Sequence, residues 1–228
     1  MPIDLTSPIE VTAFAWVPPL ARGRVRDLRV RWALEESGLP YRVRLIGGIF
    51  GTPSGPPRPE NSLTEQPFGQ VPVCKEGALC LFESGAIVLH IGEKDERLLP
   101  RDKHGRARAI AWMIAALNSM EPFSLALLIL NFSCADRPWL AEVRATFEPL
   151  AERRLTHLAA ALGQKEWLED RFTIGDLMMV EALRTFDQRL VAAHRNLAGY
   201  VARGTARPAF KRAMGAQLAD FTPDQAVA

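Results

Sequence analysis

The sequence predicts a two-domain α+β protein in which an α/β half precedes an all-helical half. Strand-like and helix-like segments alternate over the first part of the chain, whereas from His104 onward apolar residues recur with the 3.6-residue period of a helix. The run from Arg97 to Pro100 reads as a hinge between the two patterns. We therefore place an α/β domain at residues 1–97, a linker at 98–104 and an all-helical domain at 105–228.

Composition excludes several classes of protein. With 228 residues, 48% hydrophobic and 24% charged, the chain suits one large or two small soluble domains. A net charge of +2 does not indicate a nucleic-acid-binding protein. No apolar run reaches the ~18 residues of a membrane span, and Met1–Glu10 lacks the basic start of a signal peptide. We expect neither a nucleic-acid partner nor a membrane.

Cysteine and histidine usage points to a reduced compartment without a metal. The three cysteines form no CxxC pair, and the four histidines show no metal-ligand spacing. We therefore expect a cytoplasmic protein with no bound metal.

The first half reads as β-α-β followed by a hairpin and a helix. The β-α-β part implies two parallel strands with a crossover helix, and the whole order is a thioredoxin-like layout. A stretch rich in glycine and proline, residues 47–61, interrupts it and acts either as a passive linker or as a lid. The predicted elements are strands at 9–17, 41–46, 71–74 and 78–82, and helices at 24–37 and from Glu83 or Ser84 to about 94.

Pro72 is the unusual residue of the hairpin. A proline removes a donor from a strand ladder, so it belongs at a sheet edge or a bend. We predict a cis Val71–Pro72 bond that turns the strand end and leaves the Val71 backbone groups to pair with an extended ligand. Ser84, predicted to cap the following helix, and the N–H groups beside it would accept a carboxylate of the same ligand.

Gln70-Val71-Pro72 before a hairpin, with Glu83-Ser84 at a helix start, resembles the glutathione site of cytosolic glutathione S-transferases. The run from Arg29 to Glu36, with Gly38-Leu39-Pro40-Tyr41 after it, is similar to the first helix of bacterial members. The resemblance implies glutathione as co-substrate, and it implies a small hydrophobic electrophile, a homodimer and no metal. The residues it implies for glutathione binding are Gln70, Val71, Pro72, Glu83 and Ser84.

The segment that should activate the thiol departs from the family pattern. Members carry Tyr, Ser or Cys between the first strand and helix, but residues 14–26 contain no Ser, Thr, Tyr or Cys. The segment offers Arg22, Arg24 and Arg26, which oppose the helix macrodipole unless an anion joins them. Arg24, with Arg22, is our catalytic candidate. The alternative is a solvated basic face balanced by Asp27, Glu35 and Glu36.

The helical half supplies structural and pocket residues. Thr173 and Asp176 have the spacing of a capping box, and the resemblance implies a structural role for them. Pro208 stands in the first turn of a closing helix. The resemblance further implies an electrophile pocket, for which we name Trp16, Met113 and Leu117.

Three functions remain open from the sequence. The first is a glutathione transferase, which joins the thiolate of glutathione to a small electrophile. The second is a non-catalytic member of the same fold that binds glutathione or a partner protein. The third is a glutathione-dependent thiol-disulfide reductase, for which no cysteine stands at the start of the first helix.

Overall fold

The computed structural model describes residues 4–48 and 62–221. Its contacts divide the chain into two compact units, of which the first comprises the residues up to Lys94 together with the chain from Pro208 onward. The second unit comprises Asp95–Arg207. The closing helix thus groups with the N-terminal part because it packs on a helix there. The linker at 98–104 stays a prediction. Of the glycine-rich loop predicted at 47–61, Gly47 and Gly48 belong to a strand, and residues 49–61 lie outside the part of the chain that the structure describes.

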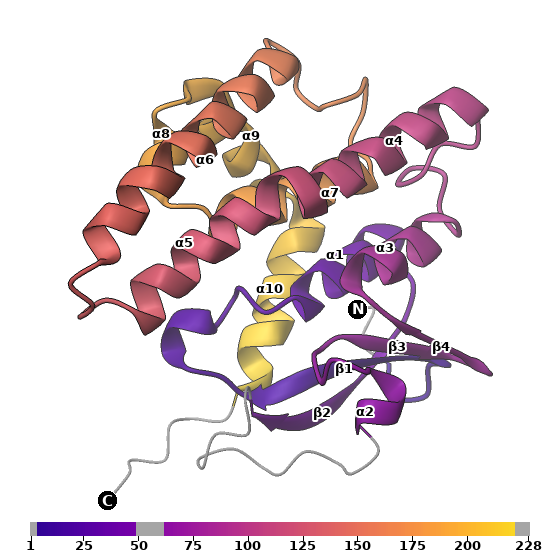
Figure 1. Ribbon diagram of the computed structural model, residues 1–228. Helices are drawn as coiled ribbons and strands as arrows, with labels where there is room; N and C mark the ends of the chain where they lie inside the picture. Colours follow the sequence, from indigo (N-terminus) through magenta and orange to yellow (C-terminus); the bar gives the residue numbers. More distant parts are fainter. Residues whose placement is uncertain (1–3, 49–61, 222–228) are drawn as a thin grey trace, which may run out of the picture. The chain divides into compact units, whose positions relative to one another are not determined.

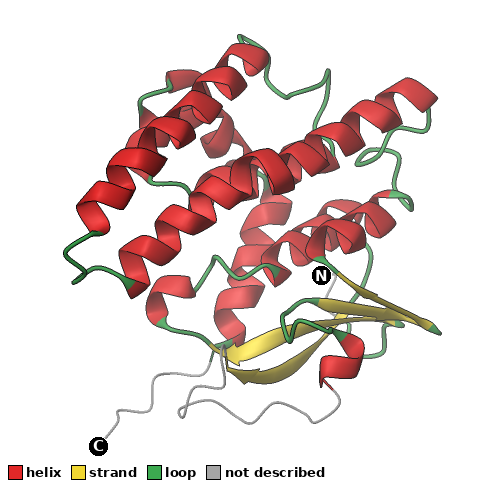
Figure 2. Ribbon diagram, in the orientation of Figure 1, coloured by secondary structure: helices red, strands yellow, loops and turns green. Residues whose placement is uncertain are grey.

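The first unit is built on a mixed four-stranded sheet in the order β2-β1-β3-β4 (Figure 2). Strand β1 pairs in parallel with β2, and the hairpin β3–β4 joins the other edge of β1 in antiparallel orientation. The strands are β1 Ile9–Trp16, β2 Arg42–Gly48, β3 Val73–Glu76 and β4 Leu79–Phe82.

Helices cover both faces of this sheet. Figure 1 shows α1 and α3 on one face and the short α2 on the other. Helix α10 packs along α1, where the Phe210 ring meets the buried Trp32 ring edge-on with centroids 4.9 Å apart. The bounds are α1 Asp27–Ser37, α2 Ser62–Glu65, α3 Ser84–Gly92 and α10 Pro208–Asp220.

Two predicted boundaries are wrong in ways that matter for the site. Helix α1 begins at Asp27 rather than Arg24, because residues 22–26 form turns and a bend, with Gly23 at a left-handed φ of 73°. Strand β3 begins at Val73 rather than Val71, because the β1–β3 register reaches only as far as the pair Val11–Cys74. Both changes leave irregular backbone where the sequence places ligand-binding residues.

The second unit is helical throughout its regular structure. Helix α7 is buried along nearly its whole length and forms the centre of the unit. A π-helical turn, Ala116–Met120, joins α4 to α5 just before Pro122. The helices are α4 Lys103–Ala115, α5 Glu121–Ser133, α6 Leu140–Leu162, α7 Ile174–Thr185, α8 Gln188–Ala192 and α9 Arg195–Ala206.

A buried capping box begins α7. The Thr173 hydroxyl accepts from the Gly175 N–H at 3.2 Å, and the Asp176 carboxylate accepts from the Thr173 N–H at 2.9 Å. Asp176 also accepts from the Leu168 N–H at 2.8 Å and from the Tyr200 hydroxyl at 2.9 Å. One buried carboxylate therefore satisfies donors from three separate segments of the unit.

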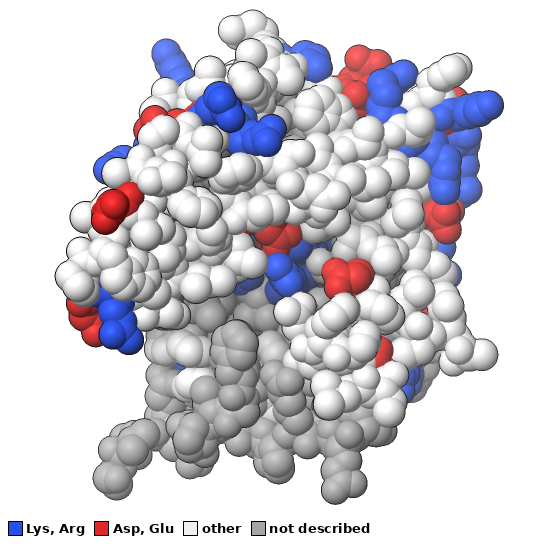
Figure 3. Space-filling view, viewed as in Figure 1, with Lys and Arg blue, Asp and Glu red and all other residues white. Residues whose placement is uncertain are grey.

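Surface charge is mixed on the face shown in Figure 3. Basic side chains gather over the start of α4. On the same helix, Arg108 pairs with Glu169 at 2.6 Å. Within the described residues, the helical stretch Lys103–Asn131 is long and apolar enough to cross a membrane, with 33% of its most apolar window buried. Core helices of soluble proteins have the same length and composition, so this stretch is weak evidence for a membrane span.

We expect Asp176→Ala to lower the free energy of unfolding by at least about 2 kcal/mol. The change removes the cap, worth ~0.5–2 kcal/mol, and leaves the buried Leu168 and Tyr200 donors unsatisfied at ~1–3 kcal/mol each. Urea unfolding midpoints measure the loss.

The matched control is Asp102→Ala, because Asp102 caps α4 through the Gly105 N–H at an exposed position. Its loss should stay within the ~0.5–2 kcal/mol of a cap alone. Equal losses in the two variants would contradict a special role for the buried box.

Candidate functional site

The register of the β3–β4 hairpin brings two predicted ligand-binding segments to one place. Val73 pairs with Phe82, so the residues before Val73 and those after Phe82 leave the hairpin at the same open end. Val71 and Pro72 lie on one side of this end, and Glu83 and Ser84 lie on the other. The sheet thus gathers these four residues around the hairpin opening.

Val71 lies beyond the strand ladder. The Val71–Pro72 peptide bond is cis, and both residues are buried. The N–H of Val73 donates to the Thr12 hydroxyl at 2.7 Å, which ends the contact between β1 and β3. The Val71 side chain joins the apolar cluster of Phe14, Val17 and Ile46. The Val71 side chain is anchored in the core, while its backbone lies outside the strand pairs of the sheet.

Ser84 is the first residue of α3, and Glu83 holds the N-cap position. The predicted cap at Ser84 is therefore wrong by one residue. The Ser84 hydroxyl instead accepts a hydrogen bond from Arg29 Nη1 at 3.2 Å, and both side chains are buried. A guanidinium from α1 thus fixes the hydroxyl at the start of α3.

The backbone of Glu83 is strained. Its φ of 70° and ψ of 114° lie in a region that residues with a Cβ rarely adopt, at a cost of about 1–3 kcal/mol. The Glu83 side chain itself is exposed. Strained backbone of this kind concentrates at ligand-binding sites, where the surrounding structure holds it.

A second arginine of this region reaches the other predicted segment. Arg26, at the N-cap of α1, donates from Nη1 to Gln70 Oε1 at 3.2 Å. Arg26 and Arg29 both contact predicted glutathione-binding residues, although the sequence reasoning did not assign either to that role. Their spacing of three residues was the available signal, since it places them on one face of a helix start.

The catalytic candidates stand on irregular backbone before α1. Arg24 is exposed, and Arg22 is half-buried with its guanidinium 5.9 Å from the ring centre of Phe221. Two of the three acids that could balance this basic segment pair with other arginines: Asp27 with Arg31 at 2.7 Å, and Glu35 with Arg212 at 2.6 Å. The third, Glu36, accepts from the Trp32 indole N–H at 2.8 Å. The choice between a thiol-stabilising role and a solvated basic face stays open.

The remaining predicted residues divide between the two units. Trp16 ends β1 in the first unit and is half-buried. Met113 is buried in α4 and Leu117 is half-buried in the π-helical turn, both in the second unit. The electrophile pocket stays a prediction.

Cysteine chemistry at the hairpin is disfavoured. Cys74 lies within β3, and burial raises the pKa of its thiol to about 11, so the thiol stays protonated at neutral pH. Cys80 is exposed on β4 and Cys134 is half-buried in the second unit. In the described part of the chain, no group of three or more His, Cys, Asp or Glu side chains could hold a metal ion.

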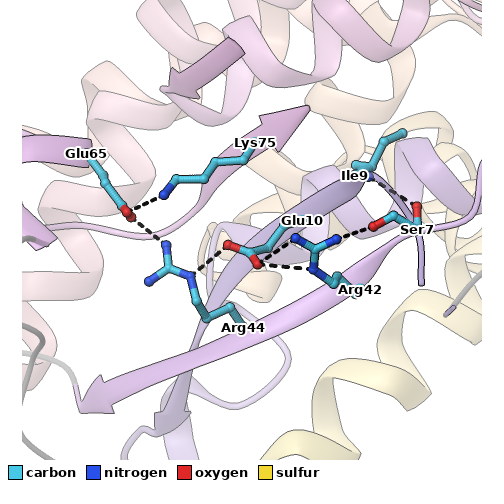
Figure 4. Close-up of polar contacts among 7 residues, drawn as sticks. All are labelled: Ser7, Ile9, Glu10, Arg42, Arg44, Glu65 and Lys75. Carbon is cyan, nitrogen blue, oxygen red and sulfur yellow. Dashed lines mark hydrogen bonds and ion pairs between the residues drawn. The ribbon is translucent and has the colours of Figure 1, made fainter. Parts of the chain in front are cut away.

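Helix α2 is tied to the sheet by an ion pair at Glu65, just before the segment that carries Gln70 and Val71. The Glu65 carboxylate accepts from Arg44 on β2 and from Lys75 on β3 (Figure 4). Partial burial raises the pKa of Glu65, but these two cations outweigh it and the net pKa lies below its usual range. The pair holds the start of the ligand-binding segment against two strands.

The ion pair continues across the outer face of the sheet. Arg44 also donates to Glu10 on β1 at 2.8 Å, and Arg42 donates to the other oxygen of Glu10 at 3.1 Å. Arg42 reaches further to the backbone carbonyl of Ser7 (Figure 4). Alternating charges from β1, β2, β3 and α2 therefore form one connected network.

We expect Glu65→Gln to lower the free energy of unfolding by about 0.5–1.5 kcal/mol at pH 7. A carboxyl whose folded pKa is depressed stabilises the fold above its unfolded pKa, and that contribution is lost as the pH falls through the folded value. The difference from wild type should therefore begin to shrink as the pH falls below about 4 and disappear only below the depressed folded pKa. Urea titrations at a series of pH values measure it.

Glu152→Gln serves as the control, because Glu152 is exposed on α6 and should change stability by less than about 0.5 kcal/mol at any pH. A Glu65→Gln deficit that persists undiminished at pH 3 would show that the carboxylate charge is not what holds α2.

Sequence comparison relates the chain to glutathione transferases. Residues 20–93 match the family model of the glutathione S-transferase N-terminal domain. A glutathione S-transferase from Hyoscyamus muticus is 27% identical over 82% of this chain and 92% of that protein. Glutathione S-transferase 4 from Zea mays is 32% identical, but the match spans only 51% of this chain and half of the maize protein.

Structural comparison covers nearly the whole chain. The crystal structure of a glutathione transferase family member from Pseudomonas fluorescens, with two glutathione molecules bound, superposes with a TM-score of 0.74. The match covers 92% of this chain and 94% of that one at 22% identity. Because both plant and bacterial proteins are similar, the bacterial subtype stays a prediction. The chain has the fold of glutathione transferase structures, with a thioredoxin-like domain built on a mixed sheet and a helical domain.

Proposed function

We propose that this protein is a glutathione transferase that binds glutathione at the hairpin opening and joins its thiolate to a small hydrophobic electrophile. The observation that carries the proposal is the convergence of Val71, Ser84 and two α1 arginines at one end of the β3–β4 hairpin. The similarity to glutathione transferases in sequence and fold supports it.

Glutathione suits the chemistry of these groups. It is a tripeptide with two carboxylates, so it can pair a backbone segment with Val71 in a strand-like manner. One carboxylate would lie at the Ser84 hydroxyl and the N-terminus of α3, where N–H groups and the helix dipole favour an anion. Gln70 and Glu83 would bind the polar ends of the peptide, with the Glu83 carboxylate facing the ligand's ammonium group.

The arginines would supply fixed positive charge. Arg29 orients the Ser84 hydroxyl, and Arg26 orients the Gln70 amide. Arg24, helped by Arg22, would stabilise the thiolate as a charge and not as a proton acceptor, since a guanidinium stays protonated. The thiol proton would pass to solvent, and the sulfur would then attack the electrophile.

A second function, binding without turnover, is favoured by one specific observation. Residues 14–26 contain no hydroxyl or thiol that could activate glutathione in the usual way. The binding groups named above would serve a non-catalytic member equally well. Measuring turnover of glutathione with an electrophile would distinguish the transferase from the non-catalytic binder. A cytoplasmic homodimer remains our proposal for the state of the protein in either case.

Calorimetric titration tests the site. We expect the protein to bind glutathione, and to bind glutathione sulfonate more tightly because its anion sits at the position of sulfur near the arginines. Ser84→Ala should weaken both ligands at least tenfold, about 1.4 kcal/mol.

The control is Ser133→Ala, an exposed serine at the end of α5 that should leave affinity unchanged. Absence of binding for both ligands to the wild-type protein would refute the proposed function.

We expect Arg24→Gln to raise the pH at which the thiolate absorbance of bound glutathione appears by about one unit. Affinity for S-methyl glutathione, which has no thiol, should change little. Ultraviolet titration of the saturated complex measures the midpoint.

Lys211→Gln removes the same charge from an exposed position on α10 and should leave the midpoint in place. A midpoint shared by Arg24→Gln and wild type would instead exclude Arg24 from thiol activation.

A further inference from the structure

Helix α10 presents one face to α1 and to the segment before it. The Phe210 ring packs on Trp32, Ala213 is fully buried, and Gln217 is 1% exposed. These residues are spaced by three and four, which places them along one side of the helix. The same side carries Met214, and Phe221 follows directly after the helix. The contacts of these last residues reach the segment that carries the catalytic candidates.

Gln217 joins two points of that segment with one side-chain amide. Its Nε2 donates to the backbone carbonyl of Val25 at 3.2 Å and to Asp27 Oδ1 at 2.7 Å. Val25 belongs to the irregular backbone before α1, and Asp27 is the first helical residue. The amide therefore fixes where the irregular segment ends and the helix begins.

Met214 covers the turn at Gly23. A Cβ atom built on Gly23 would lie 3.0 Å from Met214 Sδ, so α10 approaches this backbone as closely as a side chain allows. Gly23 also has a φ of 73°, which glycine adopts without strain. The turn between Arg22 and Arg24 therefore depends on the glycine conformation, and Met214 of α10 packs against it.

Phe221, just after α10, contacts both the segment before α1 and the apolar cluster that includes Val71. Its ring lies under the Arg22 guanidinium at 5.9 Å, and it packs against the apolar cluster that includes Val71. Ion pairs lock α10 in this position, because Arg31 on α1 bonds Asp220 and Arg212 on α10 bonds Glu35 at 2.6 Å.

We propose that Met214, Gln217 and Phe221 are positioning residues that set the geometry of the segment Pro19–Arg26, and with it the charges that would stabilise the glutathione thiolate. The inference rests on the proposed function for its chemical consequence. Its mechanical part, that α10 holds this segment, concerns the free protein alone.

Hydrogen–deuterium exchange on the full-length protein without ligand tests the mechanical part. Gln217→Met keeps the side-chain length but removes both hydrogen bonds, and it should speed exchange of the amides of residues 21–25 at least tenfold. Amides of β3 and β4 should exchange as in wild type, which separates a local effect from global destabilisation. Phe221→Ala, at a half-buried position, is the second variant and should act in the same direction.

The matched control is Leu218→Ala, next to Gln217 but 46% exposed, which should leave this segment unchanged. Unchanged exchange in both Gln217→Met and Phe221→Ala would overturn the inference.

Thiolate titration of bound glutathione tests the chemical part. Gln217→Met should raise the midpoint by at least half a pH unit, which is about a threefold loss of thiolate near neutral pH. Faster exchange with an unchanged midpoint would overturn the positioning role and leave α10 as a structural support. If the wild-type protein binds no glutathione, the proposed function fails, while the exchange result still decides whether α10 holds the segment.

Discussion

The buried guanidinium of Arg31 is the interaction on which the first unit depends. Arg31 is fully buried on α1 and bonds carboxylates from both ends of the sequence, Asp27 and Asp220. Burial lowers its pKa, but the two carboxylates outweigh this and keep the pKa above its ordinary value, so the group stays charged. Removing one member of such a pair leaves an uncompensated buried charge, which typically destabilises a fold by ~3–5 kcal/mol.

This buried pair explains why the candidate site has a defined shape before any ligand arrives. Asp27 fixes the start of α1, and the start of α1 fixes the direction of Arg26 and Arg29. Those two arginines contact Gln70 and Ser84, which belong to segments brought together by the hairpin register. On the opposite face of the sheet, Glu65 ties α2, which precedes Gln70 in the chain, to strands β2 and β3. The backbone proposed to bind the ligand is therefore held from both sides.

The sequence predicted the parts of this arrangement that depend on local chemistry. The proline at position 72, the spacing of Thr173 and Asp176 and the order of strands and helices are all visible within short windows. It did not predict the contacts of Arg26 and Arg29, because their partners Gln70 and Ser84 lie 44 and 55 positions away in the sequence. Nor could it show that Gln217 bonds Asp27, since the two are 190 positions apart and no local pattern links them.

A site that stabilises a thiolate with arginines differs in its pH response from one that uses a hydroxyl or a histidine. A guanidinium group stays protonated across the neutral pH range, so arginines supply positive charge that does not titrate there. Asp27 and Glu35 lie in ion pairs with Arg31 and Arg212, respectively. The group that titrates near neutral pH is then the thiol of the ligand itself. Any pH dependence of reaction in that range would therefore report the ligand's ionisation inside a fixed electrostatic environment.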